Sequence, residues 1–268
     1  VRAAVLPFES AGDDGKLPNG IRQRLDTFPP HYLSTTPPDR IAADLAIIGN
    51  LQPGQVVVKG KYESETDTVE YRVFAFERDV KGCFHRTCGA LSAKRLEILS
   101  AQISTTSDGV VVDGFRVLDN DFDGTVPEER IDEVAESVRN TLLGKIDVPE
   151  LFQRHRRYNA TRTSGPLSNL PTRVVVDNRS SDRCTIIDVF AHDRPALLYT
   201  IARMIYQMDL SVELAKIATH LDQVVDVFYV TGLDGRKVED EGRLQYIRDE
   251  LTATIVEFTR QEPGCVPV

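Results

Sequence analysis

The chain has 268 residues, a hydrophobic content of 41% and a formal net charge of −9. This length favours about two domains, and the composition suits a globular protein. The negative charge argues against a general binder of nucleic acid or of anionic membranes, since both need a cationic face. No apolar run approaches the roughly 18 residues of a membrane span, and the start shows no signal pattern, so we expect a cytoplasmic protein. The chain begins with Val1 rather than Met, which leaves open whether it is a fragment.

Cysteines are spread along the chain, at Cys83, Cys88, Cys184 and Cys265. They do not form a dense disulfide framework. Cys83 and Cys88 flank His85, which resembles a metal cluster, but Cys88 falls on one helical stripe with Phe84 and Leu91 and reads better as a small core residue. Zinc sites usually have tighter pairs and four ligands. We therefore expect no metal and no cofactor in this chain.

Residues 1–54 are expected to form a lead-in segment with one helix, which starts near Thr36 and carries Ile41, Leu45 and Ile48 on its apolar face. In the next unit, residues 55–147, the apolar period alternates between that of strands and that of helices. The spacing predicts two strands, a helix, two strands and a helix, at 55–62, 70–78, 82–94, 98–105, 110–118 and 127–143.

A linker, residues 148–172, follows with a short helix from Pro149 to His155. It is locally basic, and a solvated connector is a better interpretation than nucleic-acid contact. The second unit, residues 173–260, returns to the pattern of the first, and residues 261–268 form a tail. In the second unit the expected elements are strands at 173–177, 185–192, 210–219 and 224–230, and helices at 195–208 and 241–258.

The second unit repeats the first about 114 residues downstream. Phe84, Thr87, Cys88 and Leu91 on one helix face correspond to Leu198, Ile201, Ala202 and Ile205 on the other. After a slip of one residue, Asp113, Phe115 and Val117 correspond to Asp226, Phe228 and Val230. Matching residue types on matching faces indicate a duplication. We predict the order β-β-α-β-β-α in each unit, with Val56–Val58 and Arg173–Asp177 in the edge strands.

The run from Asp193 to Leu198, together with Ala215–Thr219 and Val225–Val230, resembles an ACT domain. More narrowly, the pair of units resembles the tandem ACT region at the C-terminal end of the bifunctional uridylyltransferase/uridylyl-removing enzymes that modify the signal-transduction protein PII. The resemblance covers roughly residues 28–258 and is more specific in the second unit. It implies an α+β fold of two ferredoxin-like ACT domains, each an antiparallel sheet with two helices on one face.

The chain departs from the family pattern in two places. The family usually has Gly after Asp-Arg-Pro, where this chain has Ala196, whereas the first turn, from Asp79 to Gly82, keeps the Gly and loses the Pro. Ligand binding could therefore survive in one unit and not in the other. The family's nucleotidyltransferase and hydrolase motifs are not found, and His192-Asp193 is an HD dipeptide by letter only. Whether the chain is an enzyme stays open, and Mg belongs by resemblance only to catalytic domains outside it.

The resemblance implies a regulatory sensor that binds a small amino acid, glutamine by resemblance, and acts on PII through a parent enzyme. The expected ligand contacts are two turns, Asp79, Val80, Lys81, Gly82 and Cys83 in one unit and Asp193, Arg194, Pro195, Ala196 and Leu197 in the other. Strand segments 98–103 and 212–217 would face them. The alternative is a structural or dimerisation module that binds nothing small and associates through its sheets.

Overall fold

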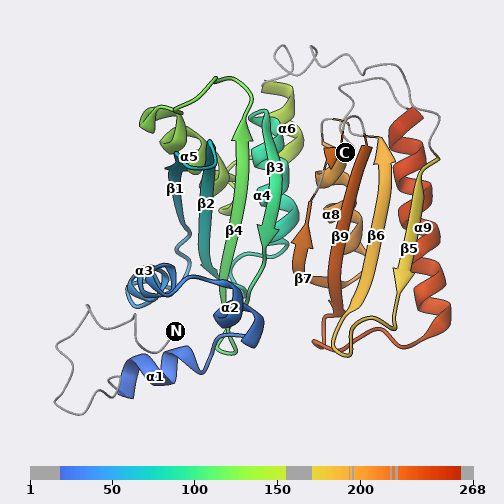
Figure 1. Ribbon diagram of the computed structural model, residues 1–268, viewed down its shortest axis with the longest axis horizontal. Helices are drawn as coiled ribbons and strands as arrows, with labels where there is room; N and C mark the ends of the chain where they lie inside the picture. The colour runs from blue at the N-terminus through green and yellow to red at the C-terminus, as the bar shows by residue number, and fades with distance from the viewer. Residues whose placement is uncertain are drawn as a thin grey trace.

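The computed structural model describes residues 19–154, 171–192, 194, 196–217, 219–220 and 223–260. Within these ranges the strands form one antiparallel sheet of nine strands. Figure 1 shows that the first half of the chain builds one end of this sheet and the second half builds the other. No helix among the described residues has the length and apolar character that crossing a bilayer demands.

The first unit has the predicted order of elements. They are β1 (Val57–Glu63), β2 (Thr68–Phe76), α4 (Cys83–Ala93), β3 (Leu96–Gln102), β4 (Val110–Asp119) and α5 (Glu128–Leu142). Alternate strand residues such as Tyr71, Val73 and Phe115 are buried against the helices, where they meet Leu91 and Val134. One face of the strands and one stripe of each helix therefore share a core.

The second unit has the same order, with one short strand added. Its elements are β5 (Arg173–Asp177), β6 (Thr185–His192), α8 (Leu197–Gln207), β7 (Leu210–Lys216), β8 (Thr219–His220), β9 (Gln223–Gly232) and α9 (Glu241–Arg260). Ile201 and Ile205 of α8 and Ile247 and Leu251 of α9 are fully buried, as the helical period predicts. The sheet order is β1-β2-β4-β3-β7-β9-β6-β5, so β1 and β5 lie at the edges as expected, and β8 pairs with β9 beside this path. The predicted fold of two antiparallel α+β units is confirmed.

The two units join through antiparallel pairing of β3 with β7. Ala101 lies opposite Ala215, and these two residues occupy equivalent positions in the sequence repeat. Each of the two strands also has a bulge at the equivalent place, between Ile98 and Ser100 in one and between Val212 and Leu214 in the other. A local two-fold axis therefore passes beside the alanine pair. Pairing of these two strands protects an edge that each unit alone would leave open.

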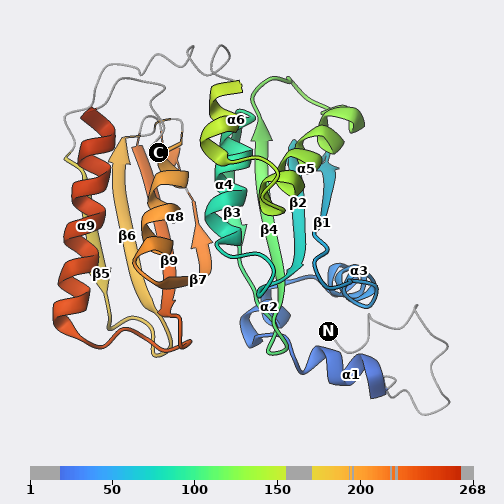
Figure 2. The same ribbon diagram turned by 180° about the vertical axis from the view of Figure 1, so that it is seen from behind.

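Helices cover one face of the joined sheet (Figure 2). A short helix after the first unit, α6 (Val148–Arg154), packs against α4, and α4 packs against α8 across the joint. Gly89 of α4 permits this approach, because a Cβ there would lie 2.5 Å from Val148 Cγ1 and 2.8 Å from Tyr199 Cδ2. The helix layer thus spans the same joint as the sheet.

The lead-in segment covers the opposite face of the first unit. In its described part it forms three helices instead of the one expected: α1 (Asn19–Leu25), α2 (Pro30–Thr35) and α3 (Pro38–Ile48). α2 and α3 each begin with a proline in the first turn, where its missing N–H costs no helical hydrogen bond. Tyr32 and Ile41 pack there against Phe74 and Val112, in a second core that is separate from the first.

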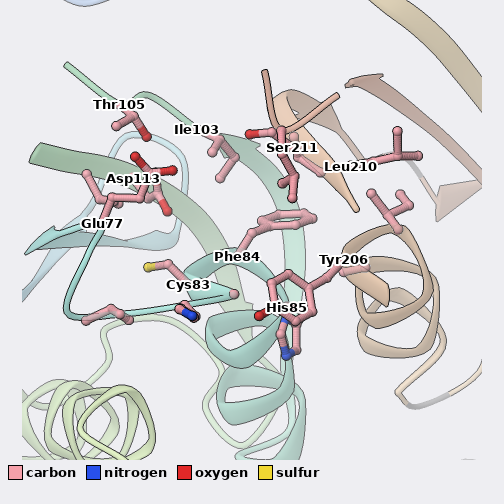
Figure 3. Close-up of a pocket in the computed structure, with 18 of the residues that line it drawn as sticks. Glu77, Cys83, Phe84, His85, Ile103, Thr105, Asp113, Tyr206, Leu210 and Ser211 are labelled. Atoms are coloured by element: carbon pink, nitrogen blue, oxygen red, sulfur yellow. The ribbon is translucent and has the colours of Figure 1, made fainter. Parts of the chain in front are cut away.

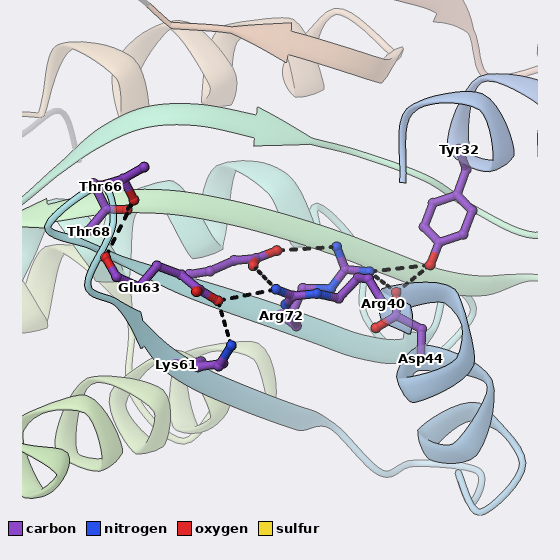
Figure 4. A network of polar contacts seen from close by, with 9 residues as sticks. Tyr32, Arg40, Asp44, Lys61, Glu63, Thr66, Thr68 and Arg72 are labelled. Carbon is purple, nitrogen blue, oxygen red and sulfur yellow. Dashed lines mark hydrogen bonds and ion pairs between the residues drawn. The ribbon is translucent and has the colours of Figure 1, made fainter. Parts of the chain in front are cut away.

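A buried polar network fastens this segment to the sheet (Figure 4). Arg72 of β2 and Tyr32 of α2 both donate hydrogen bonds to Oδ2 of Asp44 in α3. Asp44 is 1% exposed and Arg72 is 5% exposed. Nearer the surface, the Arg40 guanidinium of α3 forms an ion pair with Glu70 at 2.6 Å. Burial, and then the Asp44 carboxylate, raise the pKa of the Tyr32 hydroxyl, so it stays a hydrogen-bond donor.

Candidate functional site

The turn between β2 and α4 has a left-handed residue at its end. Gly82, the N-cap of α4, has φ +66°, and a Cβ there would overlap the ring of His85. Glycine alone can adopt this positive φ without strain and leave the space that the His85 ring occupies. No side chain caps this helix end, so backbone N–H groups of the first turn of α4 are available to a ligand. In the second unit Ala196 is the N-cap of α8 with φ +69°, again without a side-chain cap.

Replacing Ala196 by glycine should stabilise the protein by about 1 kcal/mol, because a Cβ is strained in the left-handed region. The reciprocal variant, Gly82→Ala, should destabilise by more than that amount, since it adds an overlap with His85 to the same strain. Urea unfolding of both variants measures the two effects. A lower free energy of unfolding for Ala196→Gly than for the wild-type chain would show that the Ala196 backbone is not strained.

A cavity of about 660 Å³ lies at the joint, beside the Gly82 turn. Its volume is in the range of sites for small molecules. The first unit contributes the turn and the start of α4, through Val80, Lys81, Gly82, Cys83, Phe84 and His85. The second unit contributes the end of α8 and the start of β7, through Ala202, Ile205, Tyr206, Leu210, Ser211 and Val212. A ligand here would touch both units at once.

The cavity has a polar end and an apolar end. Figure 3 shows Glu77, Thr105 and Asp113 gathered at one end, and Phe84, Tyr206 and Leu210 toward the other. Asp113 of β4 is 1% exposed, although it carries a carboxyl group. Its Oδ1 accepts a hydrogen bond from the Ser104 N–H at 3.3 Å, and its Oδ2 has no hydrogen-bond partner within the described residues.

The surroundings of Asp113 disfavour its charged form. Burial raises the pKa of this carboxyl group to about 7, and the nearby Glu77 acts in the same direction. The Ser104 amide, the Cys83 thiol and the more distant Arg72 oppose the shift without cancelling it. An aspartate that is half protonated near neutral pH and lines a cavity is a candidate functional group.

His85 forms a wall of the cavity rather than an acid or base. Burial lowers the pKa of its imidazole to about 4, and the positive charges of Arg86 and Arg203 add to this effect. The ring lies against Tyr206, with centroids 4.7 Å apart. Burial also raises the pKa of the Cys83 thiol, which is therefore protonated and a poor nucleophile. In the part of the chain that the structure describes, no group of three or more His, Cys, Asp or Glu is placed to hold a metal.

Four of the five residues predicted in the first turn line the cavity: Val80, Lys81, Gly82 and Cys83. Asp79 has another partner, because its carboxylate accepts a hydrogen bond from the Gly54 N–H at 2.7 Å. Each predicted facing segment contributes a residue, Ile103 from one and Val212 from the other. Asp113 was not predicted as a site residue. The available indication was a charged residue on the core face of a strand, repeated at Asp226.

The second predicted turn is described only in part. Asp193 and Pro195 lie outside the described residues. Arg194 donates a hydrogen bond to the Phe258 carbonyl oxygen at 2.6 Å and lies over the ring of that residue. Ala196 and Leu197 are buried, and none of these three described residues lines the cavity at the Gly82 turn.

Comparison with known proteins shows to which proteins this chain is related. Residues 180–257 match the family described as the ACR family N-terminal ACT domain. The chain is 33% identical over 179 residues to the bifunctional uridylyltransferase/uridylyl-removing enzyme of Rhodospirillum rubrum, covering 67% of this chain and 19% of that protein. It is 31% identical over 250 residues to the enzyme of the same name from Zymomonas mobilis, covering 90% of this chain and 25% of that protein. The chain is homologous to the C-terminal ACT region of these enzymes.

The chain thus spans about a fifth to a quarter of the length of these relatives. The family match covers the second ACT unit, from the turn before β6 to α9. The first ACT unit has the same order of elements, and its strands follow the same order when both units are read outward from the joint. The cavity therefore lies between two ACT units of one chain.

Proposed function

We propose that this chain is the amino-acid-sensing regulatory module of a PII uridylyltransferase/uridylyl-removing enzyme, and that its ligand is glutamine. The observation that carries the proposal is the cavity at the joint, where the Gly82 turn of one ACT unit faces β7 of the other. Such a ligand would bind both units and so favour one relative arrangement over others. Differential binding of this kind is a coupling free energy, which a regulated domain can use.

The chemistry of the cavity suits a zwitterion with a short side chain. Backbone N–H groups at the start of α4 suit a carboxylate, and the carboxyl groups of Asp113 and Glu77 suit an ammonium group. Phe84 and Leu210 offer apolar surface to the methylene groups of a side chain, and Ser211 and Gln207 offer polar groups to an amide.

The β3–β4 hairpin connects this cavity with the lead-in segment. Ile103 and Thr105 line the cavity. On the other side of the hairpin, Nε2 of His31 in α2 lies 3.3 Å from the Ile103 carbonyl oxygen and 3.2 Å from Ser104 Oγ. A ligand that moves the hairpin would therefore act on the helices that precede the ACT units. The contact between the hairpin and α2 therefore supports the proposal that ligand binding controls a domain preceding the ACT units.

Calorimetric titration of the whole chain with glutamine should give saturable heat, and saturation at 100 times Kd should stabilise the protein by about 2.7 kcal/mol. Gly82→Ala should abolish binding, because it displaces His85 and strains the turn. Gly124→Ala is the matched control: Gly124 also has positive φ, nothing lies within 4 Å of a Cβ there, and it does not line the cavity. Absence of heat at millimolar glutamine would favour the alternative.

The alternative is a docking or dimerisation module without a small ligand. Two observations favour it: Ala196 replaces the glycine expected in the second turn, and the Arg194 side chain is held by Phe258 of its own unit. Self-association would then use the edge strands β1 and β5, which lie at the two ends of the sheet order. Sedimentation of the chain over a range of concentrations separates this role from sensing.

A further inference from the structure

Oδ2 of Asp113 is a buried acceptor that no hydrogen bond within the described residues reaches, and the side-chain donor that acts on this carboxyl group is the Cys83 thiol, which is a weak one. Buried carboxyl groups are normally hydrogen-bonded at both oxygens, because leaving one unpaired costs free energy. The residue is 1% exposed, and it lines the cavity at the joint. A donor that enters the cavity would satisfy this oxygen.

The neighbours of Asp113 restrict the chemistry of that donor. Glu77 lies close enough to raise the pKa of Asp113, and it lines the same end of the cavity. Arg72 belongs to the opposite side of the sheet, where its guanidinium is bound to Asp44. Two carboxyl groups facing one space favour a cation that donates hydrogen bonds. A metal ion would need further ligands, and the described residues provide no cluster of three.

We propose that Asp113 accepts a hydrogen bond from the ammonium group of the ligand, with Glu77 beside it, and thereby restricts the cavity to small primary amines. The inference rests on the proposed function and adds the group that determines its specificity. A ligand without the ammonium group would leave Oδ2 unpaired and would be rejected. Free α-amino acids therefore bind, and the corresponding acids without an amino group do not.

The proposal also predicts how binding depends on pH. The charged ligand prefers the ionised carboxyl group, and burial keeps the pKa of that group near 7 in the empty site. Affinity should therefore rise about tenfold from pH 6 to pH 8, with proton release on binding at the lower pH. The other titratable or charged groups that act on Asp113 or line the cavity are Arg72, Glu77, Arg78, Lys81, Cys83, His85, Cys88, Tyr206 and Asp209. Of the histidine and cysteines among these, burial moves the pKa of each away from this window.

The test is calorimetric titration of the whole chain with glutamine and with glutaric acid monoamide, which is glutamine without its amino group. The wild-type chain should bind glutamine at least about 100-fold more tightly than the monoamide. Asp113→Asn, which keeps the shape and removes the charge, should lose that preference and bind both weakly. Asp119→Asn is the matched control, because Asp119 is buried on the same strand, is paired with Arg130 and does not line the cavity.

The outcomes separate this inference from the proposed function. Equal binding of glutamine and the monoamide by the wild-type chain would overturn the inference and leave the sensing role standing. Retention of full glutamine affinity by Asp113→Asn would do the same. Absence of binding by glutamine and by every other amino acid would overturn both. Thermal unfolding of each variant, recorded beside the titrations, verifies that Asp113→Asn is folded.

Discussion

Replacing Asp44 by alanine should lower the free energy of unfolding by roughly 3 kcal/mol, because it removes the buried partner of the Arg72 guanidinium and leaves only the longer ion pair to Glu70, at 3.7 Å. The Tyr32 hydroxyl would lose its acceptor in the same step. Burial raises the pKa of Asp44 against the opposing effect of Arg72, so the measurement belongs at pH 8, where the carboxyl group is more fully ionised. Urea denaturation gives the free energy. Hydrogen exchange over residues 19–48 reports whether the lead-in helices detach first.

A companion variant separates the cost of an orphaned charge from the value of the pair itself. Tyr32→Phe, Asp44→Leu and Arg72→Met together remove every polar member of the buried cluster and keep its volume nearly unchanged. This triple variant should recover most of the stability that Asp44→Ala loses, because no buried charge remains unpaired. If Asp44→Ala costs less than about 1 kcal/mol, the network does not hold the lead-in segment.

In the ligand-free protein, ionisation of Asp113 should lower the free energy of unfolding as the pH rises, and Asp113→Asn should remove this decrease. The pKa of Asp113 is about 7 in the folded chain against an ordinary value of 3.8, so the folded state binds this proton more tightly than the unfolded state does. Stability contributed by the protonated group is therefore complete below about pH 4 and is lost as the pH rises to about 7. The total is roughly 4 kcal/mol at 1.36 kcal/mol for each pKa unit.

The asparagine variant does not titrate, so its stability relative to the wild-type chain should increase between pH 4 and pH 8 by that amount at most. Urea unfolding of both proteins at several pH values measures the difference, in which all other titrating groups cancel. Parallel curves for the two proteins would show that Asp113 is not held near neutrality. A residue that reduces stability at working pH and lines a cavity fits the view that functional sites retain locally unfavourable groups.

The order of strands and helices in both units was predictable from the sequence, because apolar periodicity is a local property. The inner-face residues of α8, for example, follow from a spacing of three and four positions. The repeat was predictable for the same reason, since Phe115 and Phe228 occupy matching positions on matching strands. Four of the five residues predicted in the Gly82 turn line the cavity, and their contact with a ligand stays a prediction.

The importance of Asp113 was not predictable from the pattern. On the strand it alternates in phase with Val111 and Phe115, so its side chain enters the core, and a core position says nothing about which partners surround it. The groups that act on its carboxyl group come from separate parts of the chain, with Arg72 on β2 and Cys83 on α4. The buried network of Tyr32, Asp44 and Arg72 is similar: its members come from three elements, and no spacing along the chain relates them.

The sequence by itself determined two copies of a β-β-α-β-β-α unit and the glycine that ends the first turn. It did so because period, chain reversal and left-handed backbone depend on neighbouring residues. Only the tertiary structure decided that β3 pairs with β7, that the lead-in helices cover the other face of the first unit, and that a cavity with a buried carboxyl group opens between the units. These features depend on which surfaces meet. A strand edge or an apolar face can be satisfied by many partners, and the folded chain selects one of them.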